Sequence, residues 1–233
     1  MIPIKDENPT SGFAWITLIL LLANIGVFAY EASLPAPELN ALIGTWAFVP
    51  ARFLAEPLSP MQWATAFSSM FMHGGWLHLG SNMLYLWIFG NNIEDRMGAV
   101  RFVAFYLAAG LVAIAAQTLA DTSSGVPLLG ASGAIAGVLG AYLILYPRAR
   151  VLTVIPIFFF IELAALPAVF VIGFWFLTQL IQGVASIAPM ATEGGVAWFA
   201  HLGGFAAGLL GALPFVIADG IKRGKKRFNA TWK

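Results

Sequence analysis

The chain has 233 residues, of which 60% are hydrophobic and only 10% are charged, and its net charge is +1. Soluble domains carry about 25% charged residues, so this composition excludes an ordinary soluble domain and indicates an integral membrane protein. Cysteine is absent, which excludes disulfides, thiolate catalysis and cysteine-based metal sites. The 24 glycines are typical of closely packed membrane helices, because small residues let helix backbones approach.

Six apolar segments approach the length of about 20 residues that a helix needs to cross a membrane. In chain order they are Phe13–Tyr30, Phe71–Ile93, Val100–Leu119, Ser132–Tyr146, Leu163–Val184 and Ala197–Ala218. The fourth segment is noticeably short. The run Val151–Val184 is too long for one span, so we interpret Val151–Ile161, which contains Pro156, as a re-entrant or interfacial segment.

The positive charges favour six spans with both termini in the cytoplasm. This topology places all but one of the 12 Lys and Arg residues on the cytoplasmic side, the exception being Arg52. Splitting the Val151–Val184 run into two spans would instead place the basic cluster Lys222–Arg227 outside.

The sequence therefore predicts an all-α integral membrane fold, a bundle of six transmembrane helices. We expect a short cytoplasmic N-terminus at residues 1–12, a six-span domain at 13–219 and a basic cytoplasmic tail at 220–233. We interpret the tail as a topology anchor, with binding of lipid headgroups or of a partner as the alternative.

Strongly polar side chains inside spans are costly and usually functional. They occur where three predicted spans begin at the outer face: His73, His78 and Asn82 in the second, Ser132 in the fourth and His201 in the sixth. The rise of about 1.5 Å per helical residue places them at similar depths, several ångströms below the outer surface. Each has a simpler interpretation when taken alone, the serine as a helix cap and a histidine as a packing residue.

Glycines next to the serine and the histidine predict that their helices touch. Gly133 and Gly137 follow the serine, and Gly204 and Gly208 follow the histidine, so both helices carry a small-xxx-small pattern. A hydroxyl and an imidazole brought within about 3 Å let histidine take the proton as serine attacks a carbonyl. Because no aspartate is placed to orient the histidine, we expect a Ser–His dyad.

The attack produces an oxyanion, which needs hydrogen-bond donors. His78 and Asn82 are four residues apart and share one helix face. Ser132 begins a helix, where backbone N–H groups lack intrahelical acceptors. We expect these three residues to form an oxyanion hole, and we interpret His73 as structural or interfacial.

These motifs resemble those of the rhomboid family of intramembrane serine proteases. Gly130–Gly133 resembles the family's GxSG nucleophile motif, and Ala200–Gly208 resembles its AHxxGxxxG motif. His73–Asn82 resembles the second-helix pattern, and Gly90–Gly98 resembles GxxxExxxG. The resemblance covers about residues 65–211, with the motifs in the family's order.

The resemblance implies a role for each matching residue. Ser132 would be the nucleophile and His201 the general base, with His78, Asn82 and the Ser132 N–H as the oxyanion hole. The close-packing glycines would be Gly130, Gly133, Gly137, Gly204 and Gly208.

It also implies structural roles and a gate. Glu94 and Arg96 would tie the second and third spans together on the cytoplasmic side. The span Leu163–Val184 would gate lateral entry, so smaller residues at Phe174 and Trp175 should raise cleavage.

By the same resemblance, the substrates would be single-span membrane proteins that enter from the lipid bilayer and are cut near the outer surface, after a small residue such as alanine. We expect no metal, no cofactor and no nucleic-acid partner. The expected location is a bacterial plasma (inner) membrane, with the active site opening to the outer side.

Two positions depart from the family pattern. Trp63-Ala64 stands where many members have Trp-Arg in the first loop. Ala136 stands where bacterial relatives often have a tyrosine stacked on the histidine, so another group, such as an aromatic elsewhere, must hold His201.

Two alternatives remain at the level of sequence. A catalytically silent rhomboid-like protein could bind membrane proteins without cutting them, although such relatives usually lose the serine or the histidine. A small transporter or channel could use the polar cluster as a solute site, although the halves show no internal repeat.

Overall fold

Long helices dominate the structure, a computed structural model that describes residues 1–157, 159–186 and 197–231, the last twelve by backbone alone. The long helices are α1 (Trp15–Ser33), α5 (Trp76–Met97), α6 (Ala99–Ala120), α7 (Ser132–Leu145), α8 (Ala168–Ala185) and α9 (Trp198–Thr231). Three short helices fold the connection between α1 and α5, namely α2 (Ala36–Trp46), α3 (Pro50–Ala55) and α4 (Pro60–Ser68).

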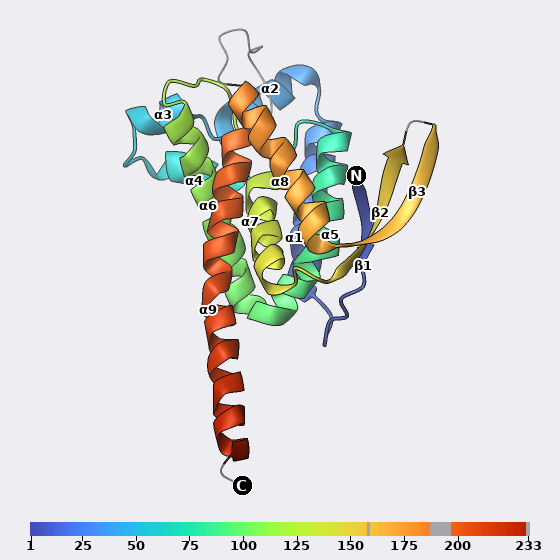
Figure 1. Ribbon diagram of the computed structural model, residues 1–233. Coiled ribbons are helices and arrows are strands. Elements are labelled where there is room, and N and C mark those ends of the chain that lie inside the picture. Colours follow the sequence, from blue (N-terminus) through green and yellow to red (C-terminus); the bar gives the residue numbers. More distant parts are fainter. Residues whose placement is uncertain (158, 187–196, 232–233) are drawn as a thin grey trace.

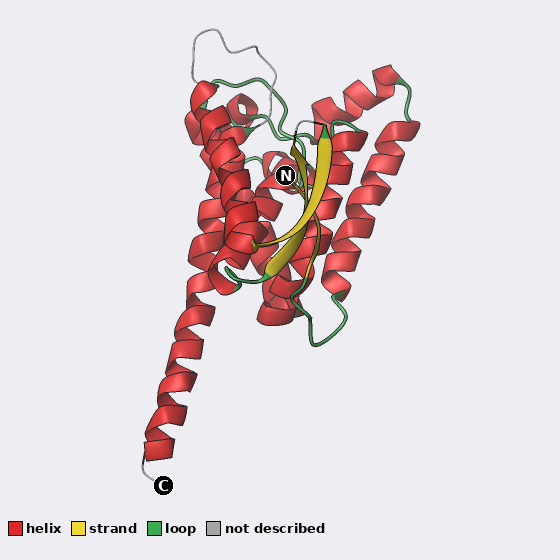
Figure 2. Cartoon of the chain, turned by 45° about the vertical axis from the view of Figure 1, so that its right-hand side comes forward, coloured by secondary structure: helices red, strands yellow, loops and turns green. Residues whose placement is uncertain are grey.

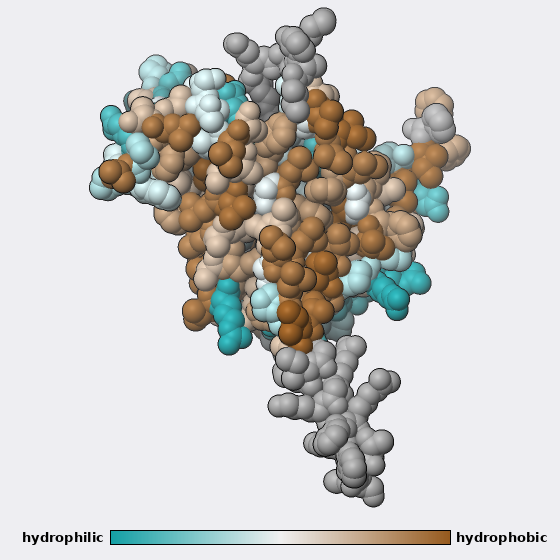
Figure 3. Space-filling view, turned by 60° about the vertical axis from the view of Figure 1, so that its left-hand side comes forward, coloured by the Kyte–Doolittle hydropathy of each residue, from teal (hydrophilic) through white to brown (hydrophobic). Residues whose placement is uncertain are grey.

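Among the described residues, four helices are long and apolar enough to cross a membrane: α1, α6, α8 and the Trp198–Asp219 part of α9. On the face that Figure 3 shows, the surface between the ends of the bundle is largely apolar. The exposed apolar side chains of the molecule include Leu22, Val100 and Leu210. Such a surface is typical of contact with lipid, and the chain is a multi-pass integral membrane protein. The apolar helix α7 has only 14 residues and α5 ends in charged residues, so six spans and the side of each terminus stay predictions.

Helix α7 lies at the centre of the bundle, in contact with α5, α6, α8 and α9 (Figure 1). Every residue from Gly133 to Tyr142 is buried. A helix that is apolar on all sides belongs in such a core. The burial of α7 explains why its first residue, Ser132, meets side chains from several neighbouring helices.

A three-stranded antiparallel sheet shows that the all-α expectation was wrong in this respect. Its strands, in the order β1-β2-β3, are β1 (Ile2–Asp6), β2 (Arg150–Ile157) and β3 (Phe160–Pro167). The sheet lies against one side of the bundle, where β1 contacts α5 (Figures 1 and 2). The predicted re-entrant segment Val151–Ile161 falls in the β2–β3 hairpin. The predicted span Leu163–Val184 begins as a helix only at Ala168, because residues 163–167 pair with β2.

The strands were missed because residues 151–167 are apolar at almost every position. A strand that is half exposed alternates apolar and polar residues, whereas an unbroken apolar run is also typical of a membrane helix. The β-branched residues Val151, Thr153, Val154 and Ile155 were the available signal for a strand.

Asp6 fixes β1 to the bundle. Its buried Oδ2 accepts hydrogen bonds from the Tyr142 hydroxyl on α7 and from Asn92 Nδ2 on α5, each at 2.8 Å. Burial raises the pKa of the Asp6 carboxyl above its ordinary value of 3.8, because desolvation disfavours the charged form more than these donors stabilise it. The predicted N-terminal segment 1–12 therefore contains a docked strand.

Glu94 and Arg96 hold α5 against α1 and α9. The prediction that they tie the second span to the third, α6, was wrong. The Glu94 carboxylate accepts the N–H of Ile16 at 2.9 Å, and the N–H and hydroxyl of Thr17 at 2.7 and 2.8 Å. It thus caps the N-terminus of α1. Arg96 forms an ion pair with Asp219 of α9. The sequence motif identified the two charged residues but carried no information about their partners.

The predicted tail is not set apart by a change in secondary structure. Helix α9 has 34 residues and continues past residue 220 to Thr231. Figure 1 shows this end of α9 extending beyond the rest of the bundle.

Candidate active site

The helices α7 and α9 touch along their backbones. A Cβ atom added to Gly204 would lie 2.0 Å from the Gly133 carbonyl oxygen, and one added to Gly208 would lie 2.0 Å from that of Gly137. No real Cβ atom approaches an oxygen so closely, so only glycine fits at these two positions of α9. Gly137 also faces α6, where its Cβ would lie 2.5 Å from that of Ala109. These contacts fix the separation between the start of α7 and the start of α9.

Ser132 and His201 meet at the ends of these two helices. Ser132 is the first residue of α7 and His201 is the fourth of α9. The serine Oγ lies 2.7 Å from the histidine Nε2, and the histidine is only 8% exposed. A hydroxyl that donates to an imidazole nitrogen at this distance can transfer its proton as the oxygen attacks.

The other ring nitrogen of His201 is held by Gln179 of α8. Its Nδ1 lies 2.6 Å from Gln179 Oε1, and both side chains are buried. Since an amide oxygen only accepts hydrogen bonds, this contact places the proton on Nδ1 and leaves Nε2 free to accept from Ser132. The Gln179 amide nitrogen donates weakly to Thr178 Oγ1 at 3.4 Å, which agrees with this orientation of the amide.

Sequence reasoning missed Gln179. It was a polar side chain inside a predicted span, the same signal that singled out Ser132 and His201. Gln182 lies one turn away in the same segment, and the sequence alone does not say which of the two faces the histidine.

Three donors converge beside the serine. His78 and Asn82 both approach Gly130, since a Cβ there would lie 2.7 Å from His78 Nε2 and 3.7 Å from Asn82 Nδ2. Gly130 has a φ of 123°, a conformation that favours glycine. Asn82 Nδ2 is buried and has no hydrogen-bond partner among the described residues. The Ser132 N–H, at the first position of α7, lacks an intrahelical acceptor.

His73 packs against His78 of this cluster. It is 4% exposed, and its ring lies edge-on to the His78 ring with centroids 5.2 Å apart. Its backbone N–H donates to Glu31 Oε2 at 3.1 Å, and its Nδ1 lies 3.2 Å from the Phe71 carbonyl oxygen. These contacts agree with the structural interpretation of His73.

A small cavity of about 40 Å³ lies next to Ser132. Small residues such as Gly130, Gly133 and Ala200 line it together with the larger Met70 and Leu129. It has room for about one water molecule or a group of similar size. Within the described ranges, no three His, Cys, Asp or Glu side chains gather into a possible metal site.

Comparison with known sequences identifies the family to which the chain belongs. Residues 60–217, more than half of the chain, match the family model described as "Rhomboid domain". The chain belongs to the rhomboid family.

Similar proteins include other rhomboids. Rhomboid protein 1, mitochondrial, of Saccharomyces cerevisiae is 31% identical over 57% of this chain and 43% of its own. RHOMBOID-like protein 5 of Arabidopsis thaliana is 31% identical over 60% of this chain and 53% of its own. The mouse presenilin-associated rhomboid-like protein, mitochondrial, is 34% identical over 50% of this chain and 32% of its own. The chain thus spans about a third to a half of these relatives.

At both positions that depart from the rhomboid pattern, other residues lie where they can take over the expected contact. Ala136 is fully buried, and the His201 ring is held by Gln179 and flanked by the rings of Trp175 and Trp198, at centroid distances of 6.0 and 6.1 Å.

In the first loop, where Ala64 replaces the expected arginine, Arg52 donates to the carbonyl oxygens of Gly44 and Ala47, at 2.5 Å each. A guanidinium group therefore braces this rhomboid's first loop from another position.

Proposed function

We propose that this rhomboid is an intramembrane serine endopeptidase that uses Ser132 as its nucleophile and His201 as its general base. The observation that carries the proposal is the chain of hydrogen bonds from the half-buried Ser132 Oγ through both nitrogens of the buried His201 to Gln179. In this arrangement the serine hydroxyl contacts the base, and a third group orients the base, as in serine hydrolases. The orienting group is here a neutral amide.

The reaction begins when the Ser132 Oγ attacks the carbonyl carbon of the scissile peptide bond. His201 Nε2 takes the hydroxyl proton. The proton on His201 Nδ1 stays on that nitrogen and keeps donating to Gln179 Oε1, which holds the ring in position. The tetrahedral intermediate carries its negative charge on the former carbonyl oxygen. Hydrogen bonds from His78 Nε2, Asn82 Nδ2 and the Ser132 N–H stabilise that charge, and the unpaired Asn82 amide supports this role.

Collapse of the intermediate breaks the peptide bond. His201 Nε2–H gives its proton to the leaving amine, and an acyl-enzyme remains on Ser132. A water molecule then gives a proton to His201 Nε2 and attacks the ester carbonyl. When the second tetrahedral intermediate collapses, the acid leaves and His201 returns the proton to Ser132 Oγ, which regenerates the serine. Apart from this water, the groups proposed for the two steps are side-chain and backbone groups of this chain.

The proposed substrates are single-span membrane proteins that enter from the lipid bilayer. The 40 Å³ cavity beside Ser132 favours a small side chain before the cut bond. Lateral entry between α5 and α8 is supported by the limited contact there, where the Tyr85 and Trp175 rings lie 6.5 Å apart. We further propose six spans, cytoplasmic termini and cleavage near the outer face of a bacterial plasma (inner) membrane, although two of the three similar proteins named above are called mitochondrial.

The test is cleavage of a model single-span substrate in liposomes by the native protein and by the Ser132→Ala and His201→Ala variants. We expect cleavage by the native protein and by a Ser33→Ala control, whose exposed serine lies at the end of α1, and none by the two site variants. Cleavage by folded Ser132→Ala at the native rate would show that another group carries the reaction. Binding of the substrate without cleavage by the native protein would favour the silent rhomboid-like binding protein.

A further inference from the structure

The helix that carries His201 begins without a capping side chain of its own. The His201 N–H donates to the Ala197 carbonyl oxygen at 3.3 Å, and this first backbone bond of α9 makes Ala197 the N-cap residue. A polar N-cap residue would accept a hydrogen bond from the N–H two or three residues further on. The alanine side chain has no acceptor, so the N–H groups of Phe199 and Ala200 need one from elsewhere.

Gln117 of the neighbouring helix α6 provides this acceptor. Its Oε1 accepts the Ala200 N–H at 3.2 Å. Ala200 is the third residue of α9 and is buried, and the Gln117 side chain is half-buried. The bond is therefore made at a position that an N-cap side chain usually serves, but by a residue far away in the sequence.

Close packing of α6 against α9 keeps the Gln117 amide next to this turn (Figure 1). A Cβ atom added to Gly203 would lie 2.3 Å from the Ala116 Cβ and 3.3 Å from the Val112 carbonyl oxygen. His201 lies two residues before Gly203, in the turn that Gln117 caps. A shift of this turn would therefore break the 2.7 Å contact between His201 Nε2 and Ser132 Oγ.

We propose that Gln117 is a positioning residue for the general base. It caps α9 from the neighbouring helix and holds the backbone of the turn that carries His201, whereas Gln179 orients the imidazole ring. Without this cap the first turn of α9 opens more often, and the imidazole spends less time within hydrogen-bond distance of Ser132. This inference rests on the proposed function, because it concerns the same pair of residues.

The experiment measures the rate at which a fluorophosphonate labels Ser132 in variants of the whole chain in liposomes, with substrate cleavage and the melting temperature measured in parallel. We expect Gln117→Leu to label about fivefold more slowly, which corresponds to about 1 kcal/mol, the typical contribution of an N-cap. Cleavage should fall by the same factor in kcat with little change in KM. Gln117→Glu should keep the native rate, because a carboxylate accepts the same N–H and suits a helix N-terminus.

A second variant moves the cap into α9 itself. In the double variant Gln117→Leu/Ala197→Ser, the serine hydroxyl at the N-cap position supplies the acceptor that leucine removes. The labelling rate should then return to within about twofold of the native rate. A folded double variant that stays as slow as Gln117→Leu would overturn the capping role. Labelling of the native protein that does not depend on His201 would overturn the proposed function, and this inference with it.

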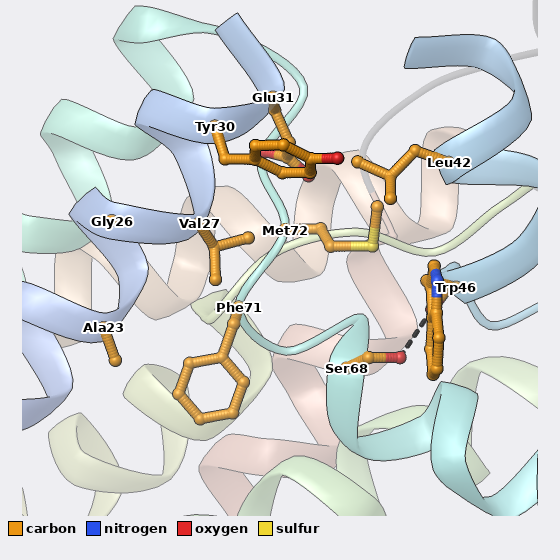
Figure 4. Close-up of a pocket in the computed structure, with 10 residues that line it drawn as sticks. All are labelled: Ala23, Gly26, Val27, Tyr30, Glu31, Leu42, Trp46, Ser68, Phe71 and Met72. Carbon is orange, nitrogen blue, oxygen red and sulfur yellow. Dashed lines mark hydrogen bonds between the residues drawn. The ribbon is translucent and has the colours of Figure 1, made fainter. Parts of the chain in front are cut away.

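Two controls separate positioning from a general loss of stability. Thr118→Ala removes a hydroxyl of α6 that donates to the Ile114 carbonyl oxygen of the same helix at 2.8 Å. Leu42→Ala removes packing at an apolar cavity of about 590 Å³, whose lining comes from α1, α2 and the segment 68–72 (Figure 4). Both controls should label at the native rate even where the melting temperature falls. A folded Gln117→Leu that also labels at the native rate would overturn the inference, as would an equal loss of rate in either control.

Discussion

Gln179 gives the sharpest prediction about catalysis, because it meets the site through one hydrogen bond that can be removed, the bond to His201 Nδ1 at 2.6 Å. Replacing it with leucine introduces an apolar side chain of similar size and removes the acceptor. The buried Nδ1–H then loses its partner, at a cost of about 1–3 kcal/mol. Since about 1.4 kcal/mol corresponds to a factor of ten in rate, we expect kcat to fall about 10–100-fold.

The assay is the initial rate of substrate cleavage in liposomes at several substrate densities, with the melting temperature of each variant measured in parallel. The loss should appear in kcat with little change in KM, because Gln179 positions the base and does not contact the substrate. Gln179→Glu should recover much of the rate, since a carboxylate oxygen can accept the same N–H. Gln182→Ala, an exposed position on the same helix, should cleave at the native rate.

A folded Gln179→Leu variant that cleaves within twofold of the native rate would refute the positioning role. A loss of the same size in Gln182→Ala would show that the effect belongs to α8 as a whole and not to the hydrogen bond.

Four further predictions follow from single contacts. Gly130→Ala should abolish cleavage, because the new Cβ would lie 2.7 Å from His78 Nε2 and the backbone has a φ of 123°; native activity in this variant would contradict the oxyanion hole. Glu94→Gln should lower the free energy of unfolding by about 2–3 kcal/mol, because the charged acceptor at the start of α1 is lost; an unchanged melting temperature would contradict this. Burial raises the pKa of the Asp6 carboxyl above 3.8. The protonated carboxyl therefore contributes fully to the free energy of unfolding below pH 3.8, and this contribution is lost as the pH rises through the raised pKa. The melting temperature of the native protein relative to Asp6→Asn should therefore fall between about pH 4 and pH 7, and a constant or rising difference would contradict the sign. Phe174→Ala should raise the cleavage rate by opening the half-exposed outer face of α8, and an unchanged or lower rate in a folded variant would count against this gate.

The site was largely predictable because polar residues are rare in membrane spans. Ser132, His201, His78 and Asn82 stood out from an apolar background, and the glycines indicated which helices touch. The structure brings all four side chains close together, within the first two turns of α5 and the first turns of α7 and α9.

The rest depended on partners that local sequence does not encode. The Glu94 motif gave a charged residue, whereas its bonds to Thr17 join segments far apart in the sequence. The strands β2 and β3 have the same apolar composition as a membrane span, and β2 also pairs with β1, which is far away in the sequence. Gln179 could be chosen over Gln182 as the partner of His201 only after the structure showed which face of α8 points to the histidine.

Labelling of the native protein with a fluorophosphonate, with the modified residue mapped by mass spectrometry, tests the nucleophile most directly. We expect the label on Ser132 alone, no labelling of Ser132→Ala, and labelling slowed at least about 100-fold in folded His201→Ala, the contribution typical of a general base. A native protein that stays unlabelled, or that labels equally fast without His201, would contradict the proposed catalytic pair.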